Sequence, residues 1–215
     1  MTMNAGSGRR AAVPTIALRA AAPYAWPYDG AVRVDHLGVL VVAAQGGFAE
    51  RCAATAETVA AIAAIERVAD AAARAGVPIV RTRHSTPVAQ RRPGSLPRPG
   101  RPGYALLPGA ADTVIDAPGF DAFFATPLAE ALAARRITHL LVCGLWLEGP
   151  VHSTLRGAND RGLECVLLTD ACAPADPALG ESAISSIEMS GGIFGAVASS
   201  ATAVAALNTT NLEES

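Results

Sequence analysis

The sequence contains no lysine. All seventeen basic residues are arginines, and together with nineteen acidic residues they give a formal net charge of -2. A chain so close to neutrality has no overall electrostatic attraction to nucleic acid or to anionic membranes, and we therefore expect neither as a partner. The missing lysine also leaves any catalytic site without an ammonium side chain.

Long apolar runs are absent as well. No stretch approaches the roughly 18 residues that a membrane-spanning helix requires, although 51% of the residues are hydrophobic. The sequence has neither a CxxC pair nor a Cys/His spacing typical of a metal site. We therefore expect buried free thiols in a reducing, cytoplasmic compartment. The cysteines concerned are Cys52, Cys143, Cys165 and Cys172.

Sequence motifs for metals and cofactors are also missing. The histidines show no HExxH or similar spacing, and the glycines form neither a GxGxxG nor a P-loop pattern. We expect no metal and no cofactor. The four histidines are His36, His84, His139 and His152.

What the sequence does contain is an alternation of short apolar runs with helical patterns. Residues 36–44 are nearly all apolar, as in a strand buried on both faces of a parallel sheet. Apolar residues recur with helical spacing over 55–75, Gly76 ends that pattern, and 77–82 is the next predicted strand. Further strands are predicted at 113–115, 137–144, 164–169 and 194–197, and further helices at 127–135, 150–161, 180–189 and 200–207.

This order of elements predicts one open α/β domain, a three-layer α/β/α sandwich around a mostly parallel sheet. We expect the domain to cover residues 23–208, with a disordered N-terminal tail at 1–22 and a C-terminal tail at 209–215. Prolines alternate with arginines over 83–103, which predicts a surface loop or lid. In such folds, ligands bind at the carboxyl ends of the strands.

Several motifs together carry a family resemblance. The predicted strand, turn and helix at 140–162 read LLVCGLWLEGPVHSTLRGANDRG, and they are accompanied by PYAWPYDG at 23–30, ATPL at 125–128 and GGIFG at 191–195. These motifs, in this order, resemble the isochorismatase-like cysteine hydrolases, in particular the subgroup of biuret hydrolase and ureidoacrylate amidohydrolase. The resemblance implies a Rossmann-like sheet of six strands in the order 3-2-1-4-5-6.

The resemblance also implies a catalytic triad that this sequence does not have. Members of the family use a Cys nucleophile, an Asp general base at the end of the first strand, and a Lys between them. They cleave C–N bonds of amides and ureas through an acyl-enzyme. The matching positions here are Pro150, Ala43 and Ala117. Proline suits the first turn of a helix, but it removes both the sulfur and a backbone N–H that an oxyanion would use.

Candidate pocket residues follow from the same strand ends. Glu148 and Asp116 are candidate carboxylate bases or simple turn residues. His152 could pair with Ser153, although adjacent residues on a helix point about 100° apart. Ser190 stands where the subgroup often has a glutamine, or is a plain helix-terminal serine. The pocket is expected to involve Gln45, Phe48, His84, Trp146, Glu148, Gly149, His152 and Ser190.

We therefore predict a catalytically inactive member of the family, a pseudoenzyme, that binds a small-molecule ligand or serves as a regulatory or structural subunit. It would form a homo-oligomer, or a hetero-oligomer with an active paralogue. The alternative is a working enzyme, such as an amide or urea C–N hydrolase, with a rewired site that does not use cysteine. A gene product without a selected role is a third hypothesis, and the preserved glycines and core pattern argue against it.

Overall fold

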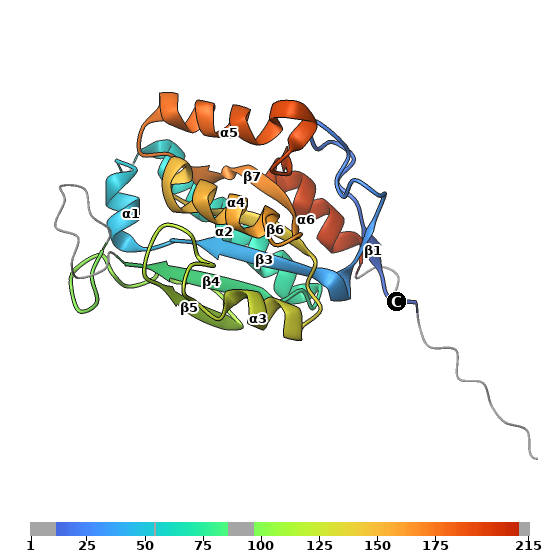
Figure 1. Cartoon of the computed structure of the whole chain (residues 1–215), viewed down its shortest axis with the longest axis horizontal. Coiled ribbons are helices and arrows are strands. Elements are labelled where there is room, and N and C mark those ends of the chain that lie inside the picture. Colours follow the sequence, from blue (N-terminus) through green and yellow to red (C-terminus); the bar gives the residue numbers. More distant parts are fainter. Residues whose placement is uncertain (1–11, 54, 86–96, 211–215) are drawn as a thin grey trace, which may run out of the picture.

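The computed structural model describes residues 12–53, 55–85 and 97–210. Its centre is a six-stranded sheet in which all neighbouring strands are parallel, in the order β5-β4-β3-β6-β7-β8 (Figure 1). Numbered along the chain, these six strands have the expected order 3-2-1-4-5-6, which is thereby confirmed. The strands are β3 (Leu37–Val42), β4 (Ile79–His84), β5 (Thr113–Ala117), β6 (His139–Leu145), β7 (Glu164–Ala173) and β8 (Ala196–Ala198).

Helices cover both faces of this sheet, so the predicted three-layer α/β/α sandwich is confirmed (Figure 1). On one face, α2 (Ala56–Arg74) and α6 (Ser200–Thr209) pack against each other. The other face carries α3 (Leu128–Ala134), α4 (His152–Asn159) and α5 (Pro177–Gly192). The helices form two layers because crossovers between parallel strands are right-handed. From β3 to β5 each new strand adds on one side of the sheet, and from β6 to β8 each adds on the other side, so the connecting helices lie on opposite faces.

The local sequence explains the central elements. All six residues of β3 are buried, as expected of a strand covered on both faces. Helix α2 begins after Thr55, whose hydroxyl accepts a hydrogen bond from the backbone N–H of Thr58 at 3.2 Å. The chain leaves the helix at Gly76, which has a φ of 67° that favours glycine. The helix predicted at 55–75 is confirmed.

The N-terminal segment corrects one expectation. Residues 12–22 belong to the folded domain rather than to a disordered tail, and residues 1–11 lie outside the described part of the chain. Leu18 is completely buried, and its backbone exchanges two hydrogen bonds with that of Trp26, at 2.7 and 3.1 Å. The apolar alternation of Ile16 and Leu18 spans too few residues to indicate a strand from sequence alone.

Three short elements are not evident from the sequence pattern. β1 (Thr15–Ile16) and β2 (Val32–Arg33) pair antiparallel in a small separate sheet, and α1 (Gly46–Arg51) follows the end of β3. Helix α1 starts with two glycines, which are unfavourable in a helix. Tertiary packing compensates, because Phe48 in this helix is buried in the core.

The Pro/Arg-rich segment predicted as a loop or lid at 83–103 starts later than expected, because β4 continues through Arg83 and His84. Residues 86–96 of that segment lie outside the described residues. Residues 97–103 contain no helix or strand, as predicted. The chain beyond them lies beside the end of β3, where the N–H groups of Gly46, Gly47 and Leu107 donate to the carbonyl oxygens of Ala105, Gly103 and Ala44.

The C-terminal helix also ends later than predicted. α6 continues to Thr209, and the next residue, Thr210, is buried, so the expected tail cannot begin at 209. Residues 211–215 lie outside the described range. Of the helices in the described parts of the chain, none is long and apolar enough to cross a lipid bilayer.

Replacing Leu18 with alanine tests whether the N-terminal segment contributes to the fold. Because this side chain is completely buried, we expect Leu18→Ala to lower the free energy of unfolding by about 2–4 kcal/mol. The neighbouring Arg19 is exposed, and Arg19→Ala should change it by less than about 0.5 kcal/mol. Urea denaturation followed by circular dichroism measures both values. If Leu18→Ala lowered the free energy of unfolding as little as Arg19→Ala, residues 12–22 would not stabilise the domain.

Candidate functional site

The three positions that the resemblance assigns to the triad lie at one edge of the sheet. Ala43 directly follows β3, Ala117 is the last residue of β5, and Pro150 lies between β6 and α4. Since the strands are parallel, all three positions are at carboxyl ends. Only β4 separates β3 from β5, so Ala43 and Ala117 are about two strand spacings, or ~10 Å, apart. Open α/β sheets bind their ligands at this edge.

The side chains at these positions are apolar and enclosed. Ala43 is 0% and Ala117 is 1% exposed, and Pro150 is also buried. Ala43 has a φ of 53°, in the left-handed region that residues other than glycine rarely adopt. Two methyl groups and a pyrrolidine ring supply no nucleophile, no base and no charge.

The turn after β6 is tight and irregular. Gly144 has a φ of 151°, and a Cβ at this position would collide with the carbonyl oxygen of Val42, so only glycine fits there. Trp146 has a φ of 57°, an unusual value for a bulky side chain. A single wide helical turn, Leu147–Val151, then leads into α4. Pro150 lies in this turn, which proline tolerates because the first turn of a helix leaves its N–H groups without intrahelical partners.

The indole ring of Trp146 covers this turn. A Cβ built on Gly149 would lie 2.7 Å from the indole, so the ring packs directly against the backbone there. The rings of Phe48 and Phe120 pack against the same indole, with centroids 5.9 and 5.3 Å away. The guanidinium of Arg51 lies 3.8 Å from the ring centroid. Of the predicted pocket residues, Phe48 and Trp146 thus belong to one aromatic cluster, and this cluster packs against Gly149.

Gln45 is buried and links three segments of the chain. Its Nε2 donates to the carbonyl oxygens of Tyr104 at 2.8 Å and of His84 at 3.2 Å. Its Oε1 accepts the backbone N–H of His84 at 2.6 Å. The amide therefore ties the end of β3 to the end of β4 and to the chain that follows residue 103. Gln45 has a structural role at this edge.

His84 is fully buried between the same strand ends. Its Nδ1 lies 2.8 Å from the carbonyl oxygen of Gly119, and its Nε2 lies 2.8 Å from the hydroxyl of Thr82. Because a carbonyl oxygen only accepts, the proton is on Nδ1, and Nε2 accepts from Thr82. Burial lowers the pKa of His84 to about 4, so the imidazole is neutral near pH 7. Both ring nitrogens already have protein partners.

Both candidate carboxylate bases are engaged in structural contacts. Glu148 accepts the backbone N–H groups of Ala175 and Asp176, each at 3.0 Å, and so holds the turn that precedes α5. Asp116 forms an ion pair with Arg83 on the neighbouring strand at 2.6 Å. This pairing lowers the pKa of the Asp116 carboxyl group.

His152 contacts α5. Its Nε2 lies 2.7 Å from the hydroxyl oxygen of Ser186, and that hydroxyl donates to the carbonyl oxygen of Ala183 at 2.9 Å. The sequence suggested Ser153 as the partner, whereas the structure pairs His152 with a serine on another helix. Burial lowers the pKa of His152, and the nearby Arg156 lowers it further.

Ser190 does not lie at the carboxyl edge. Helix α5 starts beside Glu148 and runs to the opposite edge of the sheet, where Gly192 packs against Tyr24. Ser190 is exposed at that end and has a φ of 55°. The expectation that Ser190 lines the pocket is wrong, because the length of the helix places it about 20 Å from the start of α5.

The cysteines are free and buried, as predicted from the sequence. Cys52 lies near the turn after β6, and its Sγ donates to the carbonyl oxygen of Ala173 at 3.3 Å. Burial raises the pKa of Cys52 to about 11 and the pKa values of Cys143 and Cys165 to about 12. It also raises the pKa of Cys172. All four are neutral thiols at pH 7, and a thiol must ionise before it can attack a carbonyl carbon.

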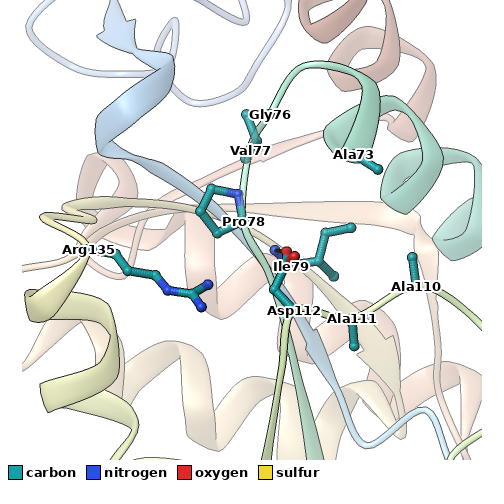
Figure 2. A pocket seen from close by; sticks show the side chains of 9 residues that line it. All are labelled: Ala73, Gly76, Val77, Pro78, Ile79, Ala110, Ala111, Asp112 and Arg135. Atoms are coloured by element: carbon teal, nitrogen blue, oxygen red, sulfur yellow. Dashed lines mark hydrogen bonds between the residues drawn. The ribbon is translucent and has the colours of Figure 1, made fainter.

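A hollow of about 390 Å³ lies at the opposite edge, at the amino ends of β4 and β5 (Figure 2). Asp112 in its wall accepts the backbone N–H of Ile79 at 2.7 Å. Arg135, which follows the end of α3, also lines the hollow. The other lining residues are alanine, glycine, valine and proline, which offer no nucleophile. This hollow is separate from the edge that carries the triad positions.

Sequence reasoning missed several neighbours of the turn. Phe120 lies just beyond Ala117 in the chain, so its place after a strand end was a usable signal. Arg51 and Tyr104 gave no such signal, because α1 and the chain after residue 103 reach the edge only through tertiary contacts. Ser186 gave none either, because it lies in the middle of a helix whose packing orientation decides what it contacts.

Known proteins resemble this chain in sequence and in fold. The sequence matches the model of the isochorismatase domain over residues 38–202, which is more than half of the chain. Ureidoacrylate amidohydrolase RutB of Methylorubrum extorquens is 38% identical over 104 residues, which are 48% of this chain and 41% of that protein. The matching part of the chain thus spans less than half the length of this relative.

Solved structures agree with the match. A cysteine hydrolase from Pseudomonas syringae pv. phaseolicola superposes with a TM-score of 0.71 and 21% identity, covering 83% of this chain and 95% of that one. An isochorismatase from Pseudomonas putida gives a TM-score of 0.67 and 26% identity, covering 80% of this chain and 91% of that one. With its motifs, its strand order and these similarities, the chain belongs to the isochorismatase family of hydrolases.

Proposed function

We propose that this protein is a pseudoenzyme of the isochorismatase family, which acts by binding and serves as a regulatory or structural subunit beside an active member. One observation supports the proposal. Ala43, Ala117 and Pro150, which the motifs align with the base, the cation and the nucleophile of the family, lie at the carboxyl ends of the strands, and the strand order and the turn into α4 are those expected of the family.

The chemistry of acyl transfer explains why these three replacements matter together. A cysteine thiol has a pKa of about 8.5. It needs a base and a nearby positively charged group to become a nucleophilic thiolate. Backbone N–H groups then stabilise the oxyanion, and losing one such donor costs about 3–4 kcal/mol of transition-state stabilisation. Two methyl groups replace the base and the cation. Pro150 supplies neither a sulfur atom nor an N–H.

The other polar groups at this edge are poor replacements. Gln45, His84 and Glu148 each bond to backbone groups that would otherwise be unpaired. Recruiting one of them for catalysis would leave those groups unpaired at a cost of about 1–3 kcal/mol each. The nearby thiol of Cys52 is buried and protonated at neutral pH. Each of these side chains supports the turns around the former site.

A binding role is supported by the aromatic surface beside the turn. Phe120, which packs on Trp146, is 40% exposed, and Phe124 is 63% exposed. Exposed aromatic side chains are typical of surfaces that contact another protein. Trp146 also keeps a strained backbone, a conformation that costs about 1–3 kcal/mol and is often found at functional sites. Both features favour a partner subunit docked at this edge.

The contact between His152 and Ser186 favours a second candidate function, a hydrolase of amide or urea C–N bonds with a serine nucleophile. Their separation of 2.7 Å is within the range for a nucleophile and its base. Two facts weaken this candidate. The Ser186 hydroxyl donates to the Ala183 carbonyl, and within the described residues no carboxylate bonds to Nδ1 of His152 to orient the ring.

The purified protein should not hydrolyse amides or ureas. With ureidoacrylate, biuret and simple amides, we expect rate accelerations below about 10³-fold, against about 10⁶-fold or more for typical enzymes. A coupled assay for released ammonia measures this. His152→Ala and Ser186→Ala are the matched variants. Turnover that persists through repeated purification and is lost in both variants would replace the pseudoenzyme with the serine hydrolase.

The four thiols should resist modification in the native protein. With 5,5′-dithiobis(2-nitrobenzoate) at pH 8, we expect almost no reaction before unfolding and four equivalents after unfolding in urea, because burial keeps the thiols protonated and inaccessible. Cys52→Ser is the control for the cysteine nearest the turn. A fast-reacting native thiol that Cys52→Ser removes would reveal a thiolate nucleophile and contradict the proposal.

A partner subunit should accompany the protein in its native host. We expect affinity-tagged protein to co-purify in fixed stoichiometry with an intact cysteine hydrolase of the same family, identified by mass spectrometry. Phe124→Ser should weaken this association at least about tenfold if the aromatic surface is the contact. Val59→Ser, which changes a similarly exposed residue on α2, should have no effect. Recovery of homo-oligomers alone would exclude the subunit role.

A further inference from the structure

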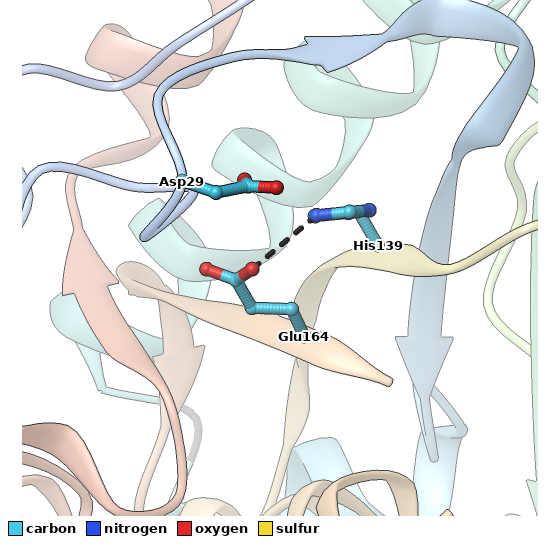
Figure 3. Close-up of side chains that lie close together, drawn as sticks. All are labelled: Asp29, His139 and Glu164. Atoms are coloured by element: carbon cyan, nitrogen blue, oxygen red, sulfur yellow. Dashed lines mark ion pairs between the residues drawn. The ribbon is translucent and has the colours of Figure 1, made fainter. Parts of the chain in front are cut away.

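Three metal-ligating side chains converge at the amino edge of the sheet, opposite the site described above (Figure 3). His139 and Glu164 are the first residues of β6 and β7 and are paired across the two strands. Asp29 approaches them from the N-terminal segment. One ligand atom from each residue lies within 4.8 Å of the other two. Neither the family match nor the triad positions assign a role to this cluster.

The spacing between His139 and Glu164 fits two ligands of one ion. Nε2 of His139 and Oε2 of Glu164 are 3.3 Å apart. A charge-assisted hydrogen bond is usually shorter, at about 2.7–2.9 Å. Two ligand atoms bound tetrahedrally to one ion at about 2.0–2.1 Å lie about 3.3 Å from each other. A small movement of the Asp29 side chain would bring a third oxygen to the same spacing.

Neighbouring groups orient the two strand residues toward this point. The hydroxyl of Thr138 lies 2.8 Å from Nδ1 of His139. With the proton on Nδ1, Nε2 presents its lone pair to the cluster, and such support of the other ring nitrogen is typical of metal-bound histidines. The backbone N–H of Tyr28 donates to Oε1 of Glu164 at 2.7 Å, which leaves Oε2 facing His139.

The hydrogen bond from Tyr28 also positions Asp29, because the two residues are adjacent in the chain. The Asp29 side chain is exposed, and no other described side chain forms an ion pair with it. It therefore brings a second negative charge close to Glu164. Two carboxylates at this distance repel each other, and a divalent cation between them would turn that repulsion into attraction.

We propose that Asp29, His139 and Glu164 bind a divalent transition-metal ion of the zinc class. One imidazole nitrogen with two carboxylate oxygens suits Zn²⁺, whereas Mg²⁺ and Ca²⁺ favour ligand sets made only of oxygen. Three protein ligands leave a fourth position for water. The ion joins the segment around residue 29 to the start of β6 and β7, and so acts as a clamp between the N-terminal segment and the sheet.

The proposal is tested on the full-length protein after dialysis against a chelator. Zinc chloride is titrated in competition with a chromophoric chelator, and thermal unfolding is measured with and without the metal. We expect saturable binding of one Zn²⁺ per chain and a melting temperature that rises with its concentration. Equimolar Mg²⁺ should produce neither effect. The readouts are affinity and melting temperature, so they are independent of any catalytic activity.

Variants locate the site. Asp29→Asn, at an exposed position where the fold should be unaffected, and Glu164→Gln, which keeps an acceptor for Tyr28, should each weaken binding at least about tenfold and reduce the thermal shift. Asp35→Asn and His36→Gln change the same residue types outside the cluster and should leave both unchanged. Absence of saturable Zn²⁺ binding, or wild-type affinity in Asp29→Asn, would overturn the proposal.

Discussion

The parallel pairing of β3 with β4 and β6 is the constraint on which both ends of this molecule depend. β3 is buried along its whole length, so its neighbours and its direction are set by the core. A parallel sheet has two chemically distinct edges, because all its carboxyl ends lie on one side. The triad positions lie at that edge, and Asp29, His139 and Glu164 lie at the other.

The carboxyl edge carries apolar side chains at Ala43, Ala117 and Pro150, together with polar side chains that bond to the backbone. Pro150 lies in the turn that leads into α4, and proline is well tolerated at the start of a helix. Polar side chains remain there because they hold backbone groups: Gln45 joins two strand ends, and Glu148 fixes the turn before α5. These hydrogen bonds give the polar side chains at this edge a structural role.

Much of the fold could be predicted because its signals are local. The doubly buried β3 and the apolar stripe of α2 are each visible within one stretch of sequence, and their helix and strand periods differ. The short elements β1, β2 and α1 could not be predicted, because a few residues do not establish a period. At the candidate site, the assignment of the triad to Ala43, Ala117 and Pro150 rests on the motifs and stays a prediction. Ser190 was misplaced because linear order does not show to which edge a helix returns its last residues.

The sequence by itself determined the order of the six strands of the central sheet and of the longer helices, the apolar residues Ala43, Ala117 and Pro150, and the absence of lysine. Only the tertiary structure decided that His152 faces Ser186 and that Asp29, His139 and Glu164 meet. The physical reason is the separation along the chain over which each kind of interaction acts. Periodicity and turn chemistry act between near neighbours in the chain, whereas these contacts depend on strand register and on how helices and loops pack across the sheet, which no short stretch of residues specifies.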